Sequence, residues 1–355
     1  MMEWSDRVNP FNSWKVLYHA ERLKNYVDWY EGKTNTLLPP IQADTNPTNL
    51  CNLDCKWCNS KGFCKEHPDT LTKEQLFYLA DLYKNWGIKG TCIAGGGEPL
   101  LNPYTVDFLK YLKIEAGLIT NGTLINKNNA LDIIKNVRWV GISLDAATIE
   151  TYKKLKNGNL KDVVNGVRSL VSARSQIQSN PMISIKYLIY PGNEGEIFKA
   201  GKMAKNLNAD NIQFRPAGLV NLYDGWIPPK EKLNIELINE QYDKVKSLET
   251  DTFKVFTVRH KFDDTFEKKI TFKKCRANLI LVPFTADGYC YVCFDLRGTK
   301  RVCKHTGILE YWGSERHREI ARNVNPKDCP RCTYVSHNEI MEKGILNDVW
   351  TRNFP

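Results

Sequence analysis

Three cysteines stand close together in the segment Cys51-Asn-Leu-Asp-Cys55-Lys-Trp-Cys58. They follow an apolar stretch that we expect to form a strand ending near residue 46, so their thiols share one short loop. Three thiolates can hold three irons of an iron–sulfur cubane and leave the fourth iron open, whereas structural zinc commonly takes four ligands. Cys64 offers a fourth thiol for zinc. The spacing therefore favours an iron–sulfur cluster and leaves zinc as the alternative.

A second group of cysteines, nearer the C-terminus, also has the spacing of a metal site. Its members are Cys275, Cys293, Cys329 and Cys332. Asp287-Gly288 between two apolar stretches predicts a β-hairpin that brings the first two of these cysteines together, and the CxxC pair supplies two more thiols. A four-cysteine zinc site and an iron–sulfur cluster both fit this arrangement. Cys290 and Cys303 are alternatives for one of the four positions.

The elements that must position the first cysteines alternate between strand and helix. Apolar runs predict strands at 41–46, 91–94, 117–120, 139–145, 183–190 and 211–215. Helical spacing, with a capping box from Thr72 to Gln75, predicts helices at 72–86, 103–113, 128–136, 148–155, 161–175 and 195–207. Six such units predict an α/β fold, a partial (β/α)6 barrel with its chemistry at the carboxyl ends of the strands.

The remaining segments are predicted to flank this barrel. An amphipathic helix is expected over 13–31, a long polar helix from Pro228 to about 249, and a short strand near 253–258. We therefore expect an N-terminal helical extension, the barrel, a connector and a small cysteine-rich domain, at residues 1–40, 41–216, 217–274 and 275–355.

Glycine-rich and polar motifs follow the predicted strands: Gly95-Gly-Gly-Glu98-Pro, Thr120-Asn-Gly, Ser143-Leu-Asp145, Asn193 and Arg215. Each alone is an ordinary turn or helix cap. Together with the CxxxCxφC pattern, in which Trp57 fills the aromatic position, they resemble the radical SAM superfamily over about residues 41–215. The resemblance implies that Cys51, Cys55 and Cys58 hold a [4Fe–4S] cluster. It also implies contacts with S-adenosylmethionine from Trp57, Gly96, Gly97, Glu98, Asn121, Ser143 and Asp145.

The same resemblance implies the chemistry. The cluster passes one electron into S-adenosylmethionine, the C5′–S bond breaks, and the 5′-deoxyadenosyl radical takes a hydrogen atom from the substrate. The second cysteine group resembles the SPASM/twitch extension of this superfamily. No cysteine follows Cys332, so one auxiliary [4Fe–4S] cluster is expected. A flavodoxin- or ferredoxin-like protein is the expected reductant.

Composition narrows the class of partner. The chain has 355 residues and a net charge of +10, which favours acidic or phosphorylated partners. The sequence has no dense basic run of the kind that indicates nucleic-acid binding. It also shows no signal peptide and no apolar run long enough to span a bilayer, so we expect a cytoplasmic protein. In a reducing compartment the eleven cysteines are expected to be ligands or buried thiols rather than disulfides. Cys64 and Cys92 are assigned to the buried class, and the histidines form no metal-binding motif.

Three hypotheses of function remain open. The first is an oxidoreductase or mutase-type enzyme that oxidises or rearranges a polar small molecule, sugar-like, aminocyclitol-like or anionic. Tyr187 and Arg215 are its candidate catalytic residues by position alone. The second is a peptide-modifying maturase, for which the roughly 40 residues before the first strand offer too little for a leader-binding domain. The third is a non-catalytic binding protein held together by zinc or a cluster. The molybdenum-cofactor precursor synthase of the family is disfavoured, because the ending Thr351-Arg-Asn-Phe-Pro355 lacks a glycine-rich tail.

Overall fold

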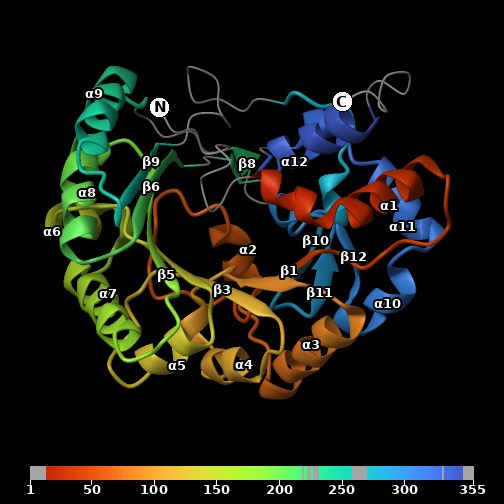
Figure 1. The fold of residues 1–355 in the computed structure, drawn as a ribbon, viewed down its shortest axis with the longest axis horizontal. Helices are drawn as coiled ribbons and strands as arrows, with labels where there is room; N and C mark the ends of the chain where they lie inside the picture. The colour runs from red at the N-terminus through yellow and green to blue at the C-terminus, as the bar shows by residue number, and fades with distance from the viewer. Residues whose placement is uncertain are drawn as a thin grey trace.

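Figure 1 shows the protein as a curved sheet with helices along its outer side. It is a computed structural model, and it describes residues 13–217, 220–221, 225–226, 232–257, 270–329 and 332–346. Ten strands form the sheet in the order β12-β11-β10-β1-β2-β3-β4-β5-β6-β9, and β7 (Val220–Asn221) pairs with β8 (Gly225–Trp226) apart from it. The predicted partial barrel is confirmed, because the six expected strands are adjacent, parallel and in chain order.

The six barrel strands keep the predicted positions within two residues. They are β1 (Gln42–Thr45), β2 (Gly90–Ile93), β3 (Glu115–Thr120), β4 (Trp139–Ser143), β5 (Met182–Ile189) and β6 (Asn211–Pro216). Residues paired in register point to the same side of a parallel sheet, and the side alternates along each strand. One face is therefore apolar and buried, with Ile93, Leu118, Val140, Ile185 and Phe214. The other face carries polar and charged residues such as Asp44, Cys92, Ser143, Lys186 and Arg215.

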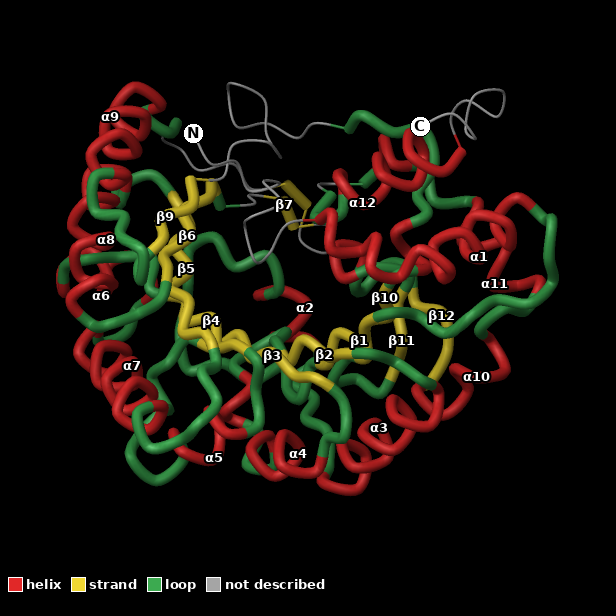
Figure 2. Tube along the Cα trace, in the orientation of Figure 1, coloured by secondary structure: helices red, strands yellow, loops and turns green. Residues whose placement is uncertain are grey.

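The apolar face is covered by the crossover helices, which line the convex side of the arc in Figure 2. They are α3 (Lys73–Trp86), α4 (Thr105–Tyr111), α5 (Ala130–Lys135), α6 (Ile149–Lys156), α7 (Leu160–Arg174) and α8 (Ile197–Asn206). Helix α3 begins with the predicted capping box: Thr72 accepts from the Gln75 amide, and the Gln75 side chain accepts from the Thr72 amide. The polar face lies on the concave side, where α2 (Lys61–Glu66) also sits.

Both edges of the barrel sheet are extended by strands from the later part of the chain. β9 (Lys254–Thr257) pairs in parallel with β6, and β10 (Leu281–Phe284) pairs in parallel with β1. The predicted hairpin then forms from β10 and β11 (Tyr289–Tyr291), and β12 (Arg301–Lys304) follows as the outermost strand. The turn of this hairpin, between β10 and β11, holds Gly288 at a φ of 81°. Glycine is favoured in this left-handed backbone conformation. One sheet therefore contains strands of the predicted barrel, the connector and the cysteine-rich domain. The boundaries between these domains stay a prediction.

Two predicted helices begin later than expected. Helix α9 runs over Ile235–Lys246, with Asn234 capping it, while Pro228 and Pro229 lie outside the described residues. The stretch Ser13–His19 is a 3₁₀ helix, and α1 (Ala20–Glu31) starts after it. Trp14 and Tyr18, taken as buried from their spacing, are 52% and 90% exposed, and Val16 is the apolar side chain of this stretch that packs in the buried cluster.

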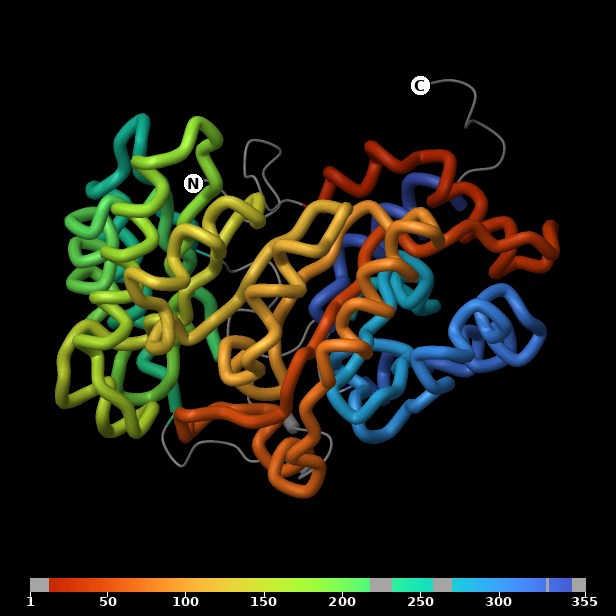
Figure 3. The backbone as a smooth tube through the Cα atoms, turned by 90° about the horizontal axis from the view of Figure 1, so that it is seen from below, coloured from red at the N-terminus to blue at the C-terminus, as the bar shows by residue number. Residues whose placement is uncertain are grey.

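The N-terminal helix packs against the C-terminal part of the chain. Leu23, Tyr26 and Val27 of α1 share one buried cluster with Leu279 and Met341. Figures 1 and 3 show α1 beside the C-terminal segments, which include α10 (Ile308–Tyr311), α11 (Glu315–Arg322) and α12 (Val335–Glu339). Within the described part of the chain, no helix is long and apolar enough to cross a membrane.

Candidate iron–sulfur and cofactor site

The loop with the first three cysteines leaves β1 and is fixed to the end of α6. The amide of Asp54 donates to the Lys156 carbonyl at 3.0 Å, and that of Lys56 donates to the Leu155 carbonyl at 3.0 Å. Inside the loop the Cys58 amide donates to the Cys55 carbonyl at 3.1 Å. The free carbonyls at the end of one crossover helix therefore hold the loop in shape.

The Cys55 thiol lies close enough to Cys51 and Cys58 for their charges to influence its ionisation. The charges of Cys58 and Cys51 act on Cys55, and burial raises the pKa of the Cys55 thiol to about 12, while Lys156 opposes this rise. Cys64 lies beside the same loop, and burial also raises its pKa to about 12, against the influence of Arg297. A thiolate needs positive charge to form in such surroundings, and a bound metal supplies it.

The glycine run after β2 packs directly on the start of the cysteine loop. The Gly97 amide donates to the Thr48 carbonyl at 3.1 Å, and the Glu98 amide donates to the Leu50 carbonyl at 2.7 Å. A Cβ atom on Gly97 would lie 1.9 Å from the Leu50 carbonyl oxygen, and one on Gly96 would lie 2.0 Å from Asn49 Oδ1. Only glycine permits this approach of two backbones.

We expect Gly97→Ala to lower the melting temperature by more than about 3 °C and to remove most bound iron, because the new methyl group must push the cysteine loop away. Gly195→Ala is the matched control, since its Cβ would meet its nearest neighbour at an ordinary 3.9 Å. Thermal unfolding and iron content of both variants give the measurement. Equal behaviour of the two variants would contradict this account of the glycine turn.

Glu98 joins the glycine run to the turn after β3. Its buried carboxylate accepts from Thr120 Oγ1 at 2.6 Å, the Asn121 amide at 2.7 Å and the Leu100 amide at 3.2 Å. The Asn121 side chain in turn donates to Asn52 Oδ1 in the cysteine loop at 2.8 Å. The motifs after β1, β2 and β3 are therefore one hydrogen-bonded assembly. The carboxylate of Glu98 holds this assembly together from within.

The motif at the end of β4 contains a buried ion pair. Asp145 Oδ2 accepts from Lys156 Nζ at 2.7 Å, and the two side chains are 2% and 1% exposed. Lys156 Nζ also donates to the Ser143 carbonyl at 2.6 Å, and Asp145 Oδ1 accepts from the Leu188 amide at 2.7 Å. Burial opposes the positive charge, but the attraction of Asp145 is strong enough to raise the pKa of Lys156 above its ordinary value. Asp145 and Ser143 are thereby positioned beside the cysteine loop.

We expect Lys156→Met to destabilise the protein by about 3–5 kcal/mol, because it leaves the Asp145 carboxylate buried without its cation. Lys110→Met is the control: its pair with Asp132 is 49% and 43% exposed, and the loss should stay below about 1 kcal/mol. Urea unfolding measures both. A loss below about 1 kcal/mol in Lys156→Met would show that the ion pair is not a structural anchor.

The other predicted site residues fall into two groups. The ring of Trp57 lies 5.3 Å from the ring of Tyr190, which follows β5, and the two rings are tilted by 44°. Arg215 lies on the polar face of the sheet. Tyr187, in contrast, lies on the apolar face, where its hydroxyl donates to the Asn193 carbonyl at 2.8 Å. This placement keeps Tyr187 off the concave side and argues against a catalytic role for it. Asn193 is fully buried and bonded to Asp145 and Leu188, which is a structural role.

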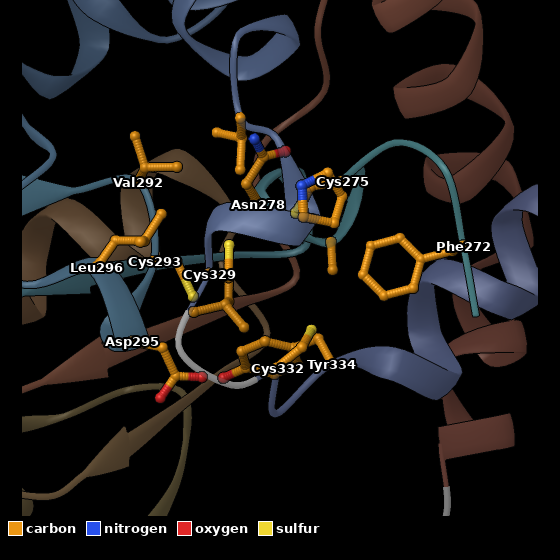
Figure 4. A pocket seen from close by; sticks show the side chains of 14 residues that line it. Phe272, Cys275, Asn278, Val292, Cys293, Asp295, Leu296, Cys329, Cys332 and Tyr334 are labelled. Atoms are coloured by element: carbon orange, nitrogen blue, oxygen red, sulfur yellow. The ribbon is translucent and has the colours of Figure 1, made fainter. Parts of the chain in front are cut away.

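The second cysteine group gathers around one cavity, shown in Figure 4. Cys275, Cys293, Cys329 and Cys332 all line it. Burial raises the pKa of the Cys293 thiol, and the charges of Cys275 and Cys332 add to this rise. Burial raises the pKa of the Cys275 thiol, and nearby N–H groups of Asn278, Asn338 and Ala277 oppose this rise. Four thiols and nearby N–H donors are the donor set of a cluster or a zinc ion.

The cysteines left open by the sequence are placed elsewhere. Cys290 and Cys303 are register partners on β11 and β12, and their free thiols interact with each other by a hydrogen bond. Neither lines the cavity. Cys92 lies on the polar face of β2 between Asp44 and Lys186. Cys64 stands beside the first loop, where a Cβ on Gly96 would lie 2.9 Å from its sulfur.

Sequence reasoning missed two buried cations and one amide at this site: Lys156, Arg297 and Asn52. Arg297 lies in the C-terminal part of the chain, yet its guanidinium bonds to Ser60 in the first cysteine region. Asn52 donates to Thr123 Oγ1 at 2.9 Å from inside the CxxxC spacing. No local pattern marks these residues, because their role depends on contacts between segments far apart in the chain.

The fold and the two cysteine sites together indicate the class of protein. A parallel partial barrel carries three cysteines after its first strand and a Gly-Gly-Glu turn after its second, and a cysteine-lined cavity adjoins it. The two cysteine sets supply the thiol ligands that iron–sulfur clusters take, and three thiolates can leave one iron open for a cofactor. In the described residues no three potential ligands are gathered closely enough to hold a metal ion as they stand. Residues 45–196 match the Radical SAM superfamily, a superfamily of enzymes that bind a [4Fe–4S] cluster and S-adenosylmethionine.

The chain is similar in sequence to named relatives and similar in fold to solved structures. The chain is 27% identical to a probable GTP 3′,8-cyclase of Saccharolobus islandicus over 56% of its own length and 63% of the cyclase. It is 25% identical to the GTP 3′,8-cyclase of Staphylococcus epidermidis over 70% of this chain and 73% of that protein. The fold resembles Streptococcus suis SuiB bound to S-adenosylmethionine, with a TM-score of 0.65, 17% identity, and 87% and 73% of the two chains covered. It also resembles anSMEcpe with bound AdoMet and Cp18Cys peptide, with a TM-score of 0.57, 18% identity, and 83% and 87% covered.

Proposed function

We propose that this enzyme cleaves S-adenosylmethionine reductively and uses the 5′-deoxyadenosyl radical to take a hydrogen atom from a polar small molecule. The observation that carries the proposal is the hydrogen-bonded assembly of the cysteine loop, the Gly-Gly-Glu turn and the Asn121 turn. When bound, the cluster supplies one electron to the sulfonium, so that the C5′–S bond breaks into methionine and the radical. A flavodoxin- or ferredoxin-like protein is the proposed source of that electron.

The chain's own residues have distinct tasks in this proposal. Cys51, Cys55 and Cys58 hold the cluster. The backbone of Gly96 and Gly97, Asn121, and the Ser143 and Asp145 turn face the cofactor, with Trp57 at its edge. Glu98 acts indirectly: its carboxylate accepts hydrogen bonds from Thr120 and Asn121 and so fixes the positions of these two residues. This arrangement sets the geometry before the cofactor arrives, which reduces the cost of binding in the reactive pose.

The cavity of Figure 4 is the proposed site of one auxiliary [4Fe–4S] cluster. Its four cysteines would fill all four iron positions, which leaves no iron open for S-adenosylmethionine. Such a cluster suits electron transfer: it can accept the electron that a substrate radical gives up in an oxidation. Cys290 and Cys303 are not proposed as ligands, because their free thiols interact with each other by a hydrogen bond outside the cavity.

An anionic small molecule is the proposed substrate class. Lys186 and Arg215 lie on the polar, concave face, in a protein with a net charge of +10. Burial, together with the charge of Arg215, lowers the pKa of Lys186 well below its ordinary value. A phosphate or carboxylate bound beside these side chains would be attracted by Arg215 and would favour the protonated, cationic form of Lys186. The relatives named GTP 3′,8-cyclase are named for a phosphorylated small molecule, which supports the same class.

A peptide substrate is the second candidate. One solved SuiB structure with a TM-score of 0.64 is bound to the precursor peptide SuiA, and anSMEcpe holds a Cp18Cys peptide. These likenesses establish a shared fold at 15% and 18% identity, and a peptide is proposed here only as the competing substrate. GTP-like metabolites and peptides encoded beside this chain should therefore be tested in parallel.

The test of the proposal is the formation of 5′-deoxyadenosine by anaerobically reconstituted protein with S-adenosylmethionine and a low-potential reductant. We expect 5′-deoxyadenosine and methionine in equal amounts, with a faster reaction when an anionic small molecule is the true substrate. Stimulation by a peptide alone would favour the second candidate. Absence of any cleavage by iron-loaded protein would refute the enzymatic proposal and leave a binding protein.

A further inference from the structure

Arg297 brings a buried positive charge from the C-terminal part of the chain to the first cysteine loop. It follows a short 3₁₀ turn, Phe294–Leu296, and its side chain is 6% exposed. Nη1 donates to Asn46 Oδ1 at 3.2 Å, and Nη2 donates to Ser60 Oγ. Asn46 directly follows β1 and Ser60 stands two residues after Cys58, so the guanidinium spans the base of the loop.

The sheet explains how Arg297 reaches this place. β10 lies beside β1 in parallel, with Phe284 as the register partner of Thr45. The Asn46 amide then donates to the Phe284 carbonyl at 2.8 Å, which ties the start of the loop to the C-terminal hairpin. The segment that follows the hairpin therefore runs next to the cysteine loop, although about 240 residues separate the two in sequence.

The partners of Arg297 are neutral. Its hydrogen bonds go to an amide oxygen and a hydroxyl, and its guanidinium lies 5.3 Å and 4.7 Å from the ring centres of Phe63 and Phe294. In the part of the chain that the structure describes, it forms no ion pair. The carboxylate whose charge acts on it, that of Asp287, is already paired with Arg301 at 3.3 Å. A buried cation without an anion is costly, so this environment calls for a negative partner.

The ionisable groups that act most strongly on Arg297 belong to the cysteine region. Burial lowers the pKa of Arg297, and the thiols of Cys64 and Cys58 oppose this most strongly. A cubane held by three thiolates carries a net negative charge, and reduction adds one more unit. The missing anion is therefore of the kind that the proposed cluster provides.

We propose that Arg297 is a positioning residue of the cluster that cleaves S-adenosylmethionine: it fixes the cysteine loop and its charge stabilises the reduced cluster. The inference rests on the proposed function, because it assigns a partner to that same cluster. Outer residues of this kind set the potential of a metal centre through charge and hydrogen bonds. A positive charge beside the cluster favours the state with the extra electron, so its removal must make the reduction potential more negative.

The test compares Arg297→Gln, which keeps an amide donor but loses the charge, with Arg297→Lys, which keeps the charge. The potential of the cluster whose EPR signal changes on adding S-adenosylmethionine is measured by redox titration of the full chain, together with iron per protein. We expect at least a tenfold lower reduction equilibrium constant in Arg297→Gln, which is about 59 mV for one electron. Arg297→Lys should stay near the unmodified protein, as should Arg301→Gln, an arginine of the same region that is 46% exposed.

Each possible result either supports or overturns the electrostatic role of Arg297 at the cluster. Loss of the responsive cluster in Arg297→Gln with retention in Arg297→Lys supports the need for charge. An unchanged potential in Arg297→Gln overturns the electrostatic role, and equal loss of iron in both variants shows a purely structural role and overturns it too. If the unmodified protein holds no cluster that responds to S-adenosylmethionine, the proposed function itself fails, which is distinct from a failure confined to the Arg297 variants.

Discussion

The Cys55→Ala variant is expected to form no 5′-deoxyadenosine from S-adenosylmethionine. Cys55 is the central thiol of the loop, and the charges of Cys51 and Cys58 both act on it. Loss of one of three thiolates leaves two ligands for a cluster that needs three, so the cluster is lost rather than weakened. The expected iron content falls from about eight to about four per chain, the remainder belonging to the auxiliary site.

Cys64→Ala is the control for this prediction. Its sulfur lies beside the same loop, but outside the motif, and the zinc alternative would need it as a fourth ligand. The cluster account expects Cys64→Ala to keep its iron and its cleavage activity. Normal 5′-deoxyadenosine formation by Cys55→Ala, or metal loss in both variants, would contradict the assignment of the three ligands.

The Cys329→Ala variant is expected to separate the two clusters. It removes one of the four thiols of the Figure 4 cavity, and the cysteine loop near β1 is left intact. We expect about four irons per chain, continued slow cleavage of S-adenosylmethionine, and no substrate product, because the electron acceptor is gone. Iron analysis and product analysis by mass spectrometry give the measurement.

Cys303→Ser is the matched control. Cys303 lies in the same region, but its free thiol interacts with that of Cys290 by a hydrogen bond outside the cavity. This variant should retain both clusters and product formation. If Cys329→Ala still forms product at the normal rate, the auxiliary cluster is not needed for the reaction. If Cys303→Ser loses the auxiliary iron instead, the ligand set of the cavity has to be revised.

Local signals in the sequence predicted much of this structure. The capping box at Thr72, the turn at Gly288 and the apolar runs of the six strands each depend on residues near one another in the chain. The same holds for the spacing of the two cysteine groups, and the cavity brings all four predicted C-terminal cysteines together. The site motifs could be found because each sits at the end of a strand, where parallel strands present their chemistry.

What the sequence did not predict depends on distant contacts. Lys156 is one of several lysines of α6, and only the fold shows that it is buried against Asp145. Arg297 reaches the first loop only because β10 adds to the barrel edge beside β1. Tyr187 was a candidate by position alone, and the alternation along β5 turns its side chain to the apolar face that the helices cover. Such contacts are fixed by packing, which one sequence does not display.

The central claim is that the chain holds a cluster for S-adenosylmethionine and an auxiliary cluster. The measurement that tests it most directly is iron and sulfide content, with Mössbauer spectra, on protein reconstituted without oxygen. The account predicts about eight irons and about eight sulfides per chain, all in [4Fe–4S] form, with one cluster altered by S-adenosylmethionine. About four irons with one zinc would contradict the auxiliary cluster and leave the cleavage site in place. Zinc alone, with no sulfide, would contradict the account as a whole.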